Sequence, residues 1–296
     1  MSITRRSIYP FGITVLAFVF AAASSALAQT PAASPTPTPP APRTSLEHDF
    51  FKNILRDQKA IWTAPFHLHS RDGRWLGPLS LGTAALIATD RSTGDEMAES
   101  SKQVNPSRII SYAGSTYGAG GVAASFYLFG RAKRNPRARE TGVLAAEALI
   151  DGAIVAGALK ELTQRARPLD GRERSEFFEG GSSFPSGHST QAWSVATVIA
   201  SEYHDRPLVQ VAAYGIASAV SIARFTGRKH YLSDVLIGSA MGYGIGKYVY
   251  HAHHRERSDS AGVEPEESRR LTRWPMIAPE YDPHAREYGV ALAWSF

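Results

Sequence analysis

Apolar positions recur mainly at helical spacing along this chain, in segments that short polar turns separate. The first segment, residues 44–64, begins with a capping box at Thr44 and Glu47. Its large apolar side chains then repeat every three to four residues until Pro65 intervenes. This pattern predicts one amphipathic helix.

Longer segments of helical composition follow in the main body of the chain. Turn-forming residues around Asp72-Gly73 and Gly77-Pro78 first precede a short apolar segment, Leu79 to Ile87. Five predicted helices then cover residues 109–130, 141–167, 188–203, 207–224 and 234–250. The pattern therefore predicts an all-α fold, a helical bundle.

Some of these segments are apolar enough to raise the question of membrane spans. Residues 109–130 are uncharged but rich in Gly, Ser and Tyr, and the next segment holds Glu147 and Asp151 near its middle. The other segments are short for a hydrocarbon layer of about 30 Å. We therefore favour a soluble or membrane-associated bundle over an integral membrane protein.

The last residues of the chain change from helical to alternating spacing. Large apolar side chains occupy every second position from Tyr288 to Phe296. Residues 274–281 can pair with them across an Asp282-Pro283 turn. We predict a short C-terminal β-hairpin.

The N-terminal residues have the pattern of a signal peptide, with two arginines, an apolar stretch and a small-residue cleavage site at Ala26-Leu27-Ala28. An uncleaved anchor is the alternative, which the short apolar stretch disfavours. We expect export to the periplasm. The predicted organisation is a signal peptide (1–28), a proline-rich tether (29–44), a helical domain (45–255) and a C-terminal linker with the hairpin (256–296).

Charge and cysteine content exclude some classes of function. Loss of the two signal-peptide arginines lowers the formal net charge from +5 to +3, which is too little to indicate a nucleic-acid partner. The chain has no cysteine, so disulfides, thiol catalysis and zinc–thiolate sites are excluded. A basic segment, 131–139, is either a solvated loop or a contact with an anionic membrane surface.

Three short motifs carry candidate chemistry, and the first is "KELTQRARP". Lys160 and Arg167 are seven residues apart, close to two helical turns, and Pro168 follows directly. We expect both cations on one helix face, with the helix ending at the second one. The alternative is a solvated basic face without a ligand.

The second motif is the tetrapeptide Pro185-Ser186-Gly187-His188, which precedes a segment of helical composition. Its backbone N–H groups would then lie at a helix N-terminus, where the helix dipole favours phosphate-like anions. The alternative is that Ser186 only caps the helix.

The third motif, "ARFTGRKHYLSD", contains Arg224, His230 and Asp234. An imidazole that attacks through one nitrogen needs its other N–H held by an acceptor, and a carboxylate four residues on can supply one. The alternative is local capping by Asp234 at a helix start.

Together the motifs K-x6-R-P, P-S-G-H and R-x5-H-x3-D resemble the three-part signature of the phosphatidic acid phosphatase type 2 and haloperoxidase superfamily. The resemblance covers residues 141–250. It implies a helical bundle of the acid phosphatase and haloperoxidase type. One position departs from the pattern, because Ala223 stands where members usually carry serine and one phosphate hydrogen bond is lost.

The resemblance implies a phosphate-binding site that works without a metal or another cofactor. Lys160, Arg167 and Arg224 would surround the phosphate oxygens, and the backbone N–H groups of Ser186 and Gly187 would complete the site. These charges would stabilise the transition state electrostatically, as a magnesium ion does in other phosphoryl-transfer sites.

The same resemblance implies the chemical steps. His230 would attack phosphorus and form a phosphohistidine, Asp234 would orient the ring of His230, and His188 would act as general acid and then as general base. The expected activity is an exported, metal-independent phosphatase acting on phosphomonoesters or diphosphates, lipid phosphates among them. Two alternatives stay open: a vanadate-dependent haloperoxidase on the same scaffold, and a non-enzymatic envelope protein.

Overall fold

The computed structural model describes residues 46–96, 107, 110–168, 175–260, 276–282 and 287–293. The predicted signal peptide and tether lie outside these residues, as does most of the predicted C-terminal linker. Within the described part, residues up to His253 form one compact unit and those from His254 onward form a second.

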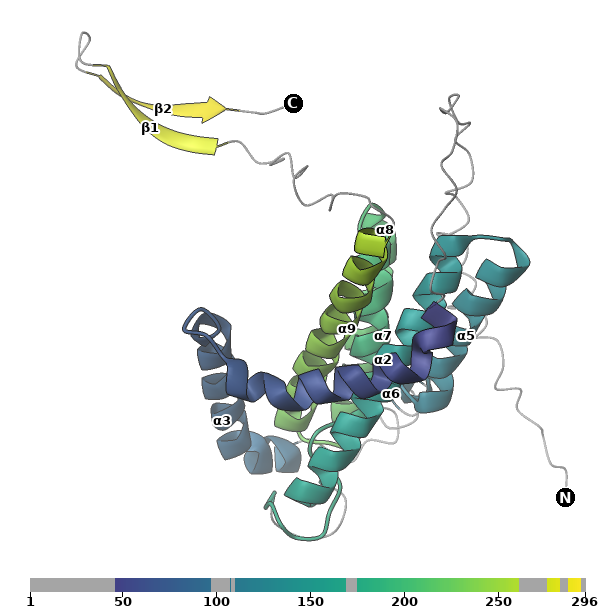
Figure 1. The fold of residues 1–296 in the computed structure, drawn as a ribbon. Coiled ribbons are helices and arrows are strands. Elements are labelled where there is room, and N and C mark those ends of the chain that lie inside the picture. The colour runs from purple at the N-terminus through teal and green to yellow at the C-terminus, as the bar shows by residue number, and fades with distance from the viewer. Residues whose placement is uncertain are drawn as a thin grey trace, which may run out of the picture. The chain divides into compact units, whose positions relative to one another are not determined.

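The first unit is helical, which confirms the predicted all-α class (Figure 1). The elements are α2 (Leu46–Thr63), η2 (Ala64–His67), α3 (Gly73–Glu96), α5 (Thr116–Ala132), α6 (Pro136–Thr163), α7 (Gly187–Glu202), α8 (Pro207–Thr226) and α9 (Leu232–Ser260), of which the part up to His253 belongs to this unit.

Helix α3 is longer than the sequence pattern indicated. The predicted turn at Gly77-Pro78 lies inside the helix, which already begins at Gly73. Proline lacks one backbone donor and disturbs the preceding turn. Since Pro78 is only the sixth residue of α3, the helix loses a single early hydrogen bond and continues, so the predicted turn was wrong.

The predicted helix 109–130 is interrupted at Gly114-Ser115. Ser115 has extended backbone angles and accepts a hydrogen bond from the Gly118 N–H at 3.1 Å, so it is the N-cap of α5. A side chain on Gly114 would collide with Val220 at 2.2 Å, so the break lets the chain pass close to α8.

The core of this unit lies where α6 packs against α2, α5 and α7, and where α7 packs against α8. Each of five helices contributes a large side chain that is at most 1 % exposed: Phe126, Leu144, Val198, Val220 and Val249. Alanine fills much of the remaining core. Small side chains let the helices approach closely, and this fixes the helix ends that carry the three motifs.

Helix α9 lies against α7 through glycines spaced four residues apart. A side chain on Gly242 would meet the Thr190 carbonyl oxygen at 2.2 Å, and one on Gly238 would meet the Ser186 carbonyl oxygen at 2.6 Å. Four residues is about one helical turn, so the glycines share one face. This glycine face holds the start of α9, which carries Asp234, against the start of α7, which carries His188.

Two helices among the described residues, α6 and α8, are long and apolar enough to cross a membrane. In α6, however, 61 % of the apolar window is buried inside the protein, because α6 is the core helix; in α8 the share is 39 %. Length and composition therefore do not distinguish a span from a core helix here.

The second unit contains the hairpin that the alternating pattern predicted. Strand β1 (Met276–Asp282) pairs antiparallel with β2 (Glu287–Ala293), with Met276 opposite Ala293 and Asp282 opposite Glu287. Each strand begins or ends one residue nearer the turn than predicted, and the outer predicted positions, 274–275 and 294–296, lie outside the described residues.

Candidate active site

The end of α6 brings the two cations of the first motif to one serine, although not in the predicted way. Helix α6 ends at Thr163 because Gln164 adopts a left-handed conformation, with φ of 45°. Arg167 therefore lies beyond the helix, and the prediction of a shared helix face was wrong. The chain instead folds back, so that Lys160 Nζ donates to the Ser182 carbonyl at 2.6 Å and Arg167 Nη2 donates to Ser182 Oγ at 3.2 Å.

The second motif forms the predicted helix start, with Ser186 at the N-cap of α7. The Ser186 N–H, however, donates to the Asp234 carbonyl at 3.0 Å, and Ser186 Oγ accepts from Ser189 Oγ at 3.0 Å. This overturns the prediction that the Ser186 N–H binds phosphate, since that donor is already used. Gly187 remains at the helix start, with its α-carbon beside the Lys160 side chain.

His230 is 2 % exposed and lies in the turn between α8 and α9. Its Nδ1 is 2.7 Å from the carbonyl oxygen of Ser183. A carbonyl oxygen can only accept, so Nδ1 must carry the proton and donate it. Nε2 then holds the lone pair, which is the tautomer that a nucleophilic histidine requires.

Asp234 supports His230 indirectly and not through the predicted hydrogen bond to its ring. Its Oδ2 lies 3.6 Å from His230 Nδ1, beyond hydrogen-bonding range, and instead accepts from Ser183 Oγ at 2.5 Å and from the Tyr231 N–H at 2.9 Å. The predicted direct hydrogen bond is therefore corrected: the Ser183 carbonyl holds the ring. The carboxylate holds both Ser183 and the backbone after His230.

The cations of the three motifs are near enough to His188 for their charges to act on it. Burial first, then the charges of Arg224 and of the other cations, lower the pKa of His188 to about 4. Burial and the charge of Arg167 lower the pKa of Arg224 to about 10. Arg224 is 9 % exposed, and its Nε has no hydrogen-bond partner among the described residues. We call Lys160, Arg167, Gly187 and Arg224 the cradle. Its positive charges attract an anion.

Burial also lowers the pKa of His230 to about 4, against the opposing charge of Asp234. Burial alone would raise the pKa of Asp234, but His230, Arg165 and the Ser183 hydroxyl together hold it below its ordinary value. At neutral pH the site therefore combines a carboxylate, two neutral imidazoles and a set of cations. That arrangement can bind a phosphate group and present a nucleophilic nitrogen to it.

Comparison with known proteins places these motifs in a family. Residues 141–258 match the model of the PAP2 superfamily. This segment belongs to the PAP2 superfamily. The resemblance predicted from the three motifs is thereby confirmed, and the PAP2 segment contains every predicted site residue.

Two individual proteins are also similar to the chain. A lipid A 1-phosphatase from Porphyromonas gingivalis is 42 % identical over 69 residues, which are 23 % of this chain and 16 % of that protein. The match thus spans about a sixth of the relative's length. A transmembrane PAP2 type phosphatidylglycerolphosphate phosphatase from Bacillus subtilis, a solved structure, has a TM-score of 0.44 and 20 % identity over 70 % of this chain and 95 % of that one.

The PAP2 segment also contains a buried arginine beside Asp234 that the sequence analysis missed. Arg165 is completely buried, and its guanidinium donates to Asp234 Oδ1 at 2.6 Å and to Asp90 Oδ2 at 2.8 Å. Ser233 bridges the same groups, accepting from Arg165 at 2.7 Å and donating to Asp90. The guanidinium lies over the Tyr231 ring, 4.4 Å from its centroid.

This network ties the site to α3, outside the PAP2 segment. The only sequence signal for Arg165 was its place two residues before Arg167, and Asp90 gave no signal because 75 residues separate it from its partner. A buried arginine between two carboxylates is a strong constraint, because removing one partner leaves an uncompensated charge. Asp90 and Arg165 therefore act as positioning residues for Asp234.

Proposed function

We propose that this protein is a phosphatase that hydrolyses phosphate monoesters or diphosphates of lipids through a phosphohistidine on His230. The observation that supports the proposal is the tautomer of His230, whose Nδ1–H donates to the Ser183 carbonyl and whose Nε2 thus keeps the lone pair that a nucleophile needs. The cations around His188 supply the site for the phosphate oxygens.

In the first step, His230 Nε2 forms a bond to phosphorus while the bond from phosphorus to the ester oxygen breaks. The departing oxygen takes the electron pair and receives a proton from His188. The cations by themselves disfavour a proton on His188; a bound phosphate brings negative charge that offsets them and lets His188 hold that proton. In the second step His188 takes a proton from water, which attacks phosphorus and releases His230.

The preference for a lipid rests on the surroundings of the cradle. The end of α6, the segment before α7 and the end of α8 expose large apolar side chains: Leu162 is 63 %, Phe178 77 % and Ile222 61 % exposed. Where exposed apolar groups gather into one patch, they often mark a contact with a ligand or a membrane. The name of the lipid A 1-phosphatase relative points in the same direction.

A contact with an anionic membrane through the basic segment has weaker support. Arg137 pairs with Asp205, and Arg139 Nε lies 3.7 Å from Glu47 Oε1, so two of its cations have partners within the protein. Arg131, Lys133 and Arg134 remain exposed. We propose a periplasmic location from the signal-peptide pattern; fractionation of cells and sequencing of the mature N-terminus test it.

The activity test uses the purified chain with a chelator, assayed on phosphatidic acid in detergent micelles and on a soluble aryl phosphate. We expect turnover of both, a higher kcat/KM for the lipid, and a loss of about 1,000-fold or more in His230→Ala. His204→Ala is the matched control, since His204 lies beyond the far end of α7, about 24 Å from His188 along the helix. Unchanged turnover in His230→Ala would refute the mechanism, and equal kcat/KM for both substrates would refute the lipid preference.

A further inference from the structure

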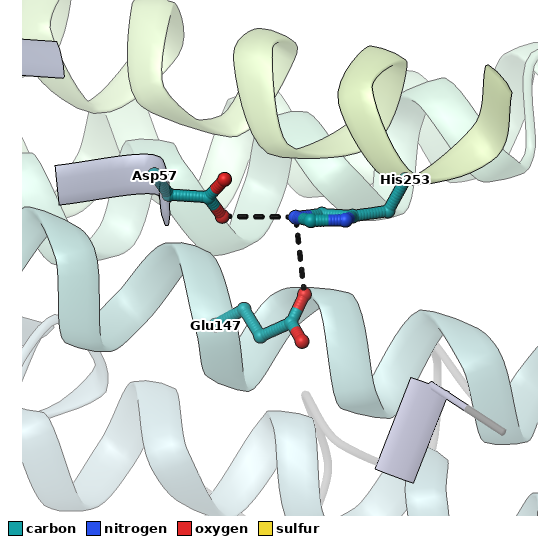
Figure 2. Close-up of side chains that lie close together, drawn as sticks. All are labelled: Asp57, Glu147 and His253. Atoms are coloured by element: carbon teal, nitrogen blue, oxygen red, sulfur yellow. Dashed lines mark hydrogen bonds and ion pairs between the residues drawn. The ribbon is translucent and has the colours of Figure 1, made fainter. Parts of the chain in front are cut away.

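A second group of ionisable side chains is buried where α2, α6 and α9 meet, apart from the cradle. Asp57 and Glu147 are completely buried and His253 is 1 % exposed. Figure 2 shows that one ring nitrogen of His253 is directed at both carboxylates. His253 Nε2 is 2.9 Å from Asp57 Oδ2 and 3.7 Å from Glu147 Oε2.

The neighbouring side chains form hydrogen bonds to only half of the carboxylate oxygens of Asp57, Glu147 and Asp151. Glu147 Oε1 accepts from Asn53 at 3.1 Å, and Asp151 Oδ1 accepts from Gln58 at 2.8 Å. Asp57 Oδ1, Glu147 Oε2 and Asp151 Oδ2 are buried without a hydrogen-bond partner among the described residues. Buried polar atoms are almost always paired, so three such oxygens in one cluster call for a ligand.

The charge of the cluster points to a cation. Asp57, Glu147 and Asp151 are completely buried, and the imidazole of His253 lies beside the first two. Three carboxyl groups thus share one imidazole, and a divalent cation would compensate two negative charges at the centre.

The distances in the cluster favour a bound metal ion over a proton shared between His253 and the carboxylates. A single N–H on Nε2 is well directed at only one of the two carboxylate oxygens that it meets. Ligands about 2.0–2.1 Å from a tetrahedral zinc ion lie about 3.3 Å from one another. The two measured separations bracket that value, and all three candidate ligand atoms lie within 4.8 Å of one another.

We propose that Asp57, Glu147 and His253 bind a zinc ion. A mixed set of imidazole and carboxylate ligands suits zinc better than magnesium or calcium, which prefer oxygen alone. Glu147 precedes Lys160 by 13 residues of α6, about 20 Å along the helix, so the ion takes no part in phosphate chemistry. It ties α2 to the core helices, and the inference does not rest on the proposed function.

The test measures metal content and thermal stability of the full chain, purified without an affinity tag from zinc-supplemented medium. We expect about one equivalent of zinc per chain by mass spectrometry. Dialysis against chelator removes the zinc, and Zn²⁺ at about a hundredfold excess over its Kd raises Tm by about 5 °C or more, whereas Mg²⁺ and Ca²⁺ do not. Chelator lowers Tm but leaves phosphatase turnover at 25 °C unchanged.

Two variants locate the ion, Glu147→Gln and His253→Gln, and both are expected to lose the zinc and the shift in Tm. Glu202→Gln is the matched control: Glu202 is also a buried carboxyl whose pKa burial raises to about 7, and it lies outside the cluster. Zinc-free wild-type protein with a Tm that Zn²⁺ does not change overturns the proposal. So does wild-type zinc content in both variants, which places the ion elsewhere, or a shift with Mg²⁺ or Ca²⁺ alone. If the variants fail to fold, the wild-type measurements decide.

Discussion

The protonation of Lys160 gives a quantitative prediction for the cradle. Burial first, then the charge of Arg167, lowers the pKa of the Lys160 amine to about 8. The charged form is therefore about 90 % populated at pH 7 and about 10 % at pH 9. Because kcat/KM reports the ionisation of the free enzyme, loss of this charge weakens capture of the phosphate as pH rises.

The assay compares the pH profile of the wild type with that of Lys160→Arg, whose guanidinium stays charged throughout this range. All other titrations, including that of the substrate, are the same in both proteins. The kcat/KM of the wild type divided by that of Lys160→Arg therefore reports the ionisation of Lys160 alone. This ratio should fall about tenfold from pH 7 to pH 9. Lys229→Arg, a change at an exposed lysine, is the control and should leave the profile unchanged. A ratio for Lys160→Arg that stays constant over this range would refute the reasoning.

Two further substitutions test the positioning network and the helix packing. Asp90→Asn leaves Arg165 with one carboxylate fewer, so kcat should fall about tenfold. KM should stay nearly unchanged, because the cradle is intact. A rise in KM alone would argue against a positioning role. Gly242→Ala places a methyl group 2.2 Å from the Thr190 carbonyl and should lower the free energy of unfolding by about 1–3 kcal/mol. Gly244→Ala, with open space around it, should be neutral or raise that free energy by up to about 1 kcal/mol, and denaturant unfolding of both variants checks the contrast.

Much of the architecture follows from local sequence signals. Helical spacing predicted the bundle, and alternation predicted the hairpin, since both depend on nearest neighbours along the chain. The helix start at Gly187 was likewise predictable from the proline and glycine before His188. These features are encoded within a few residues, so they need no knowledge of the rest of the fold.

The parts that could not be predicted depend on distant partners or on single backbone angles. The left-handed Gln164 ends α6 before Pro168, a conformation that glutamine rarely adopts. The Ser186 N–H is used by the Asp234 carbonyl across two motifs. The contact between Arg165 and Asp90 joins positions 75 residues apart. Motif spacing identifies which residues meet, but only the folded chain shows which hydrogen bonds remain for a ligand.

The most direct test of the central claim is to trap the phosphorylated enzyme. The wild-type chain is mixed with radiolabelled lipid phosphate, quenched in alkali, which preserves phosphohistidine, and digested for mass spectrometry. The label should be found on His230 and should be absent from His230→Ala, while His188→Ala, which lacks the group that activates water, should retain it longer. Label on His188, or steady turnover by the wild type with no covalent label, would contradict the assignment of His230 as the nucleophile.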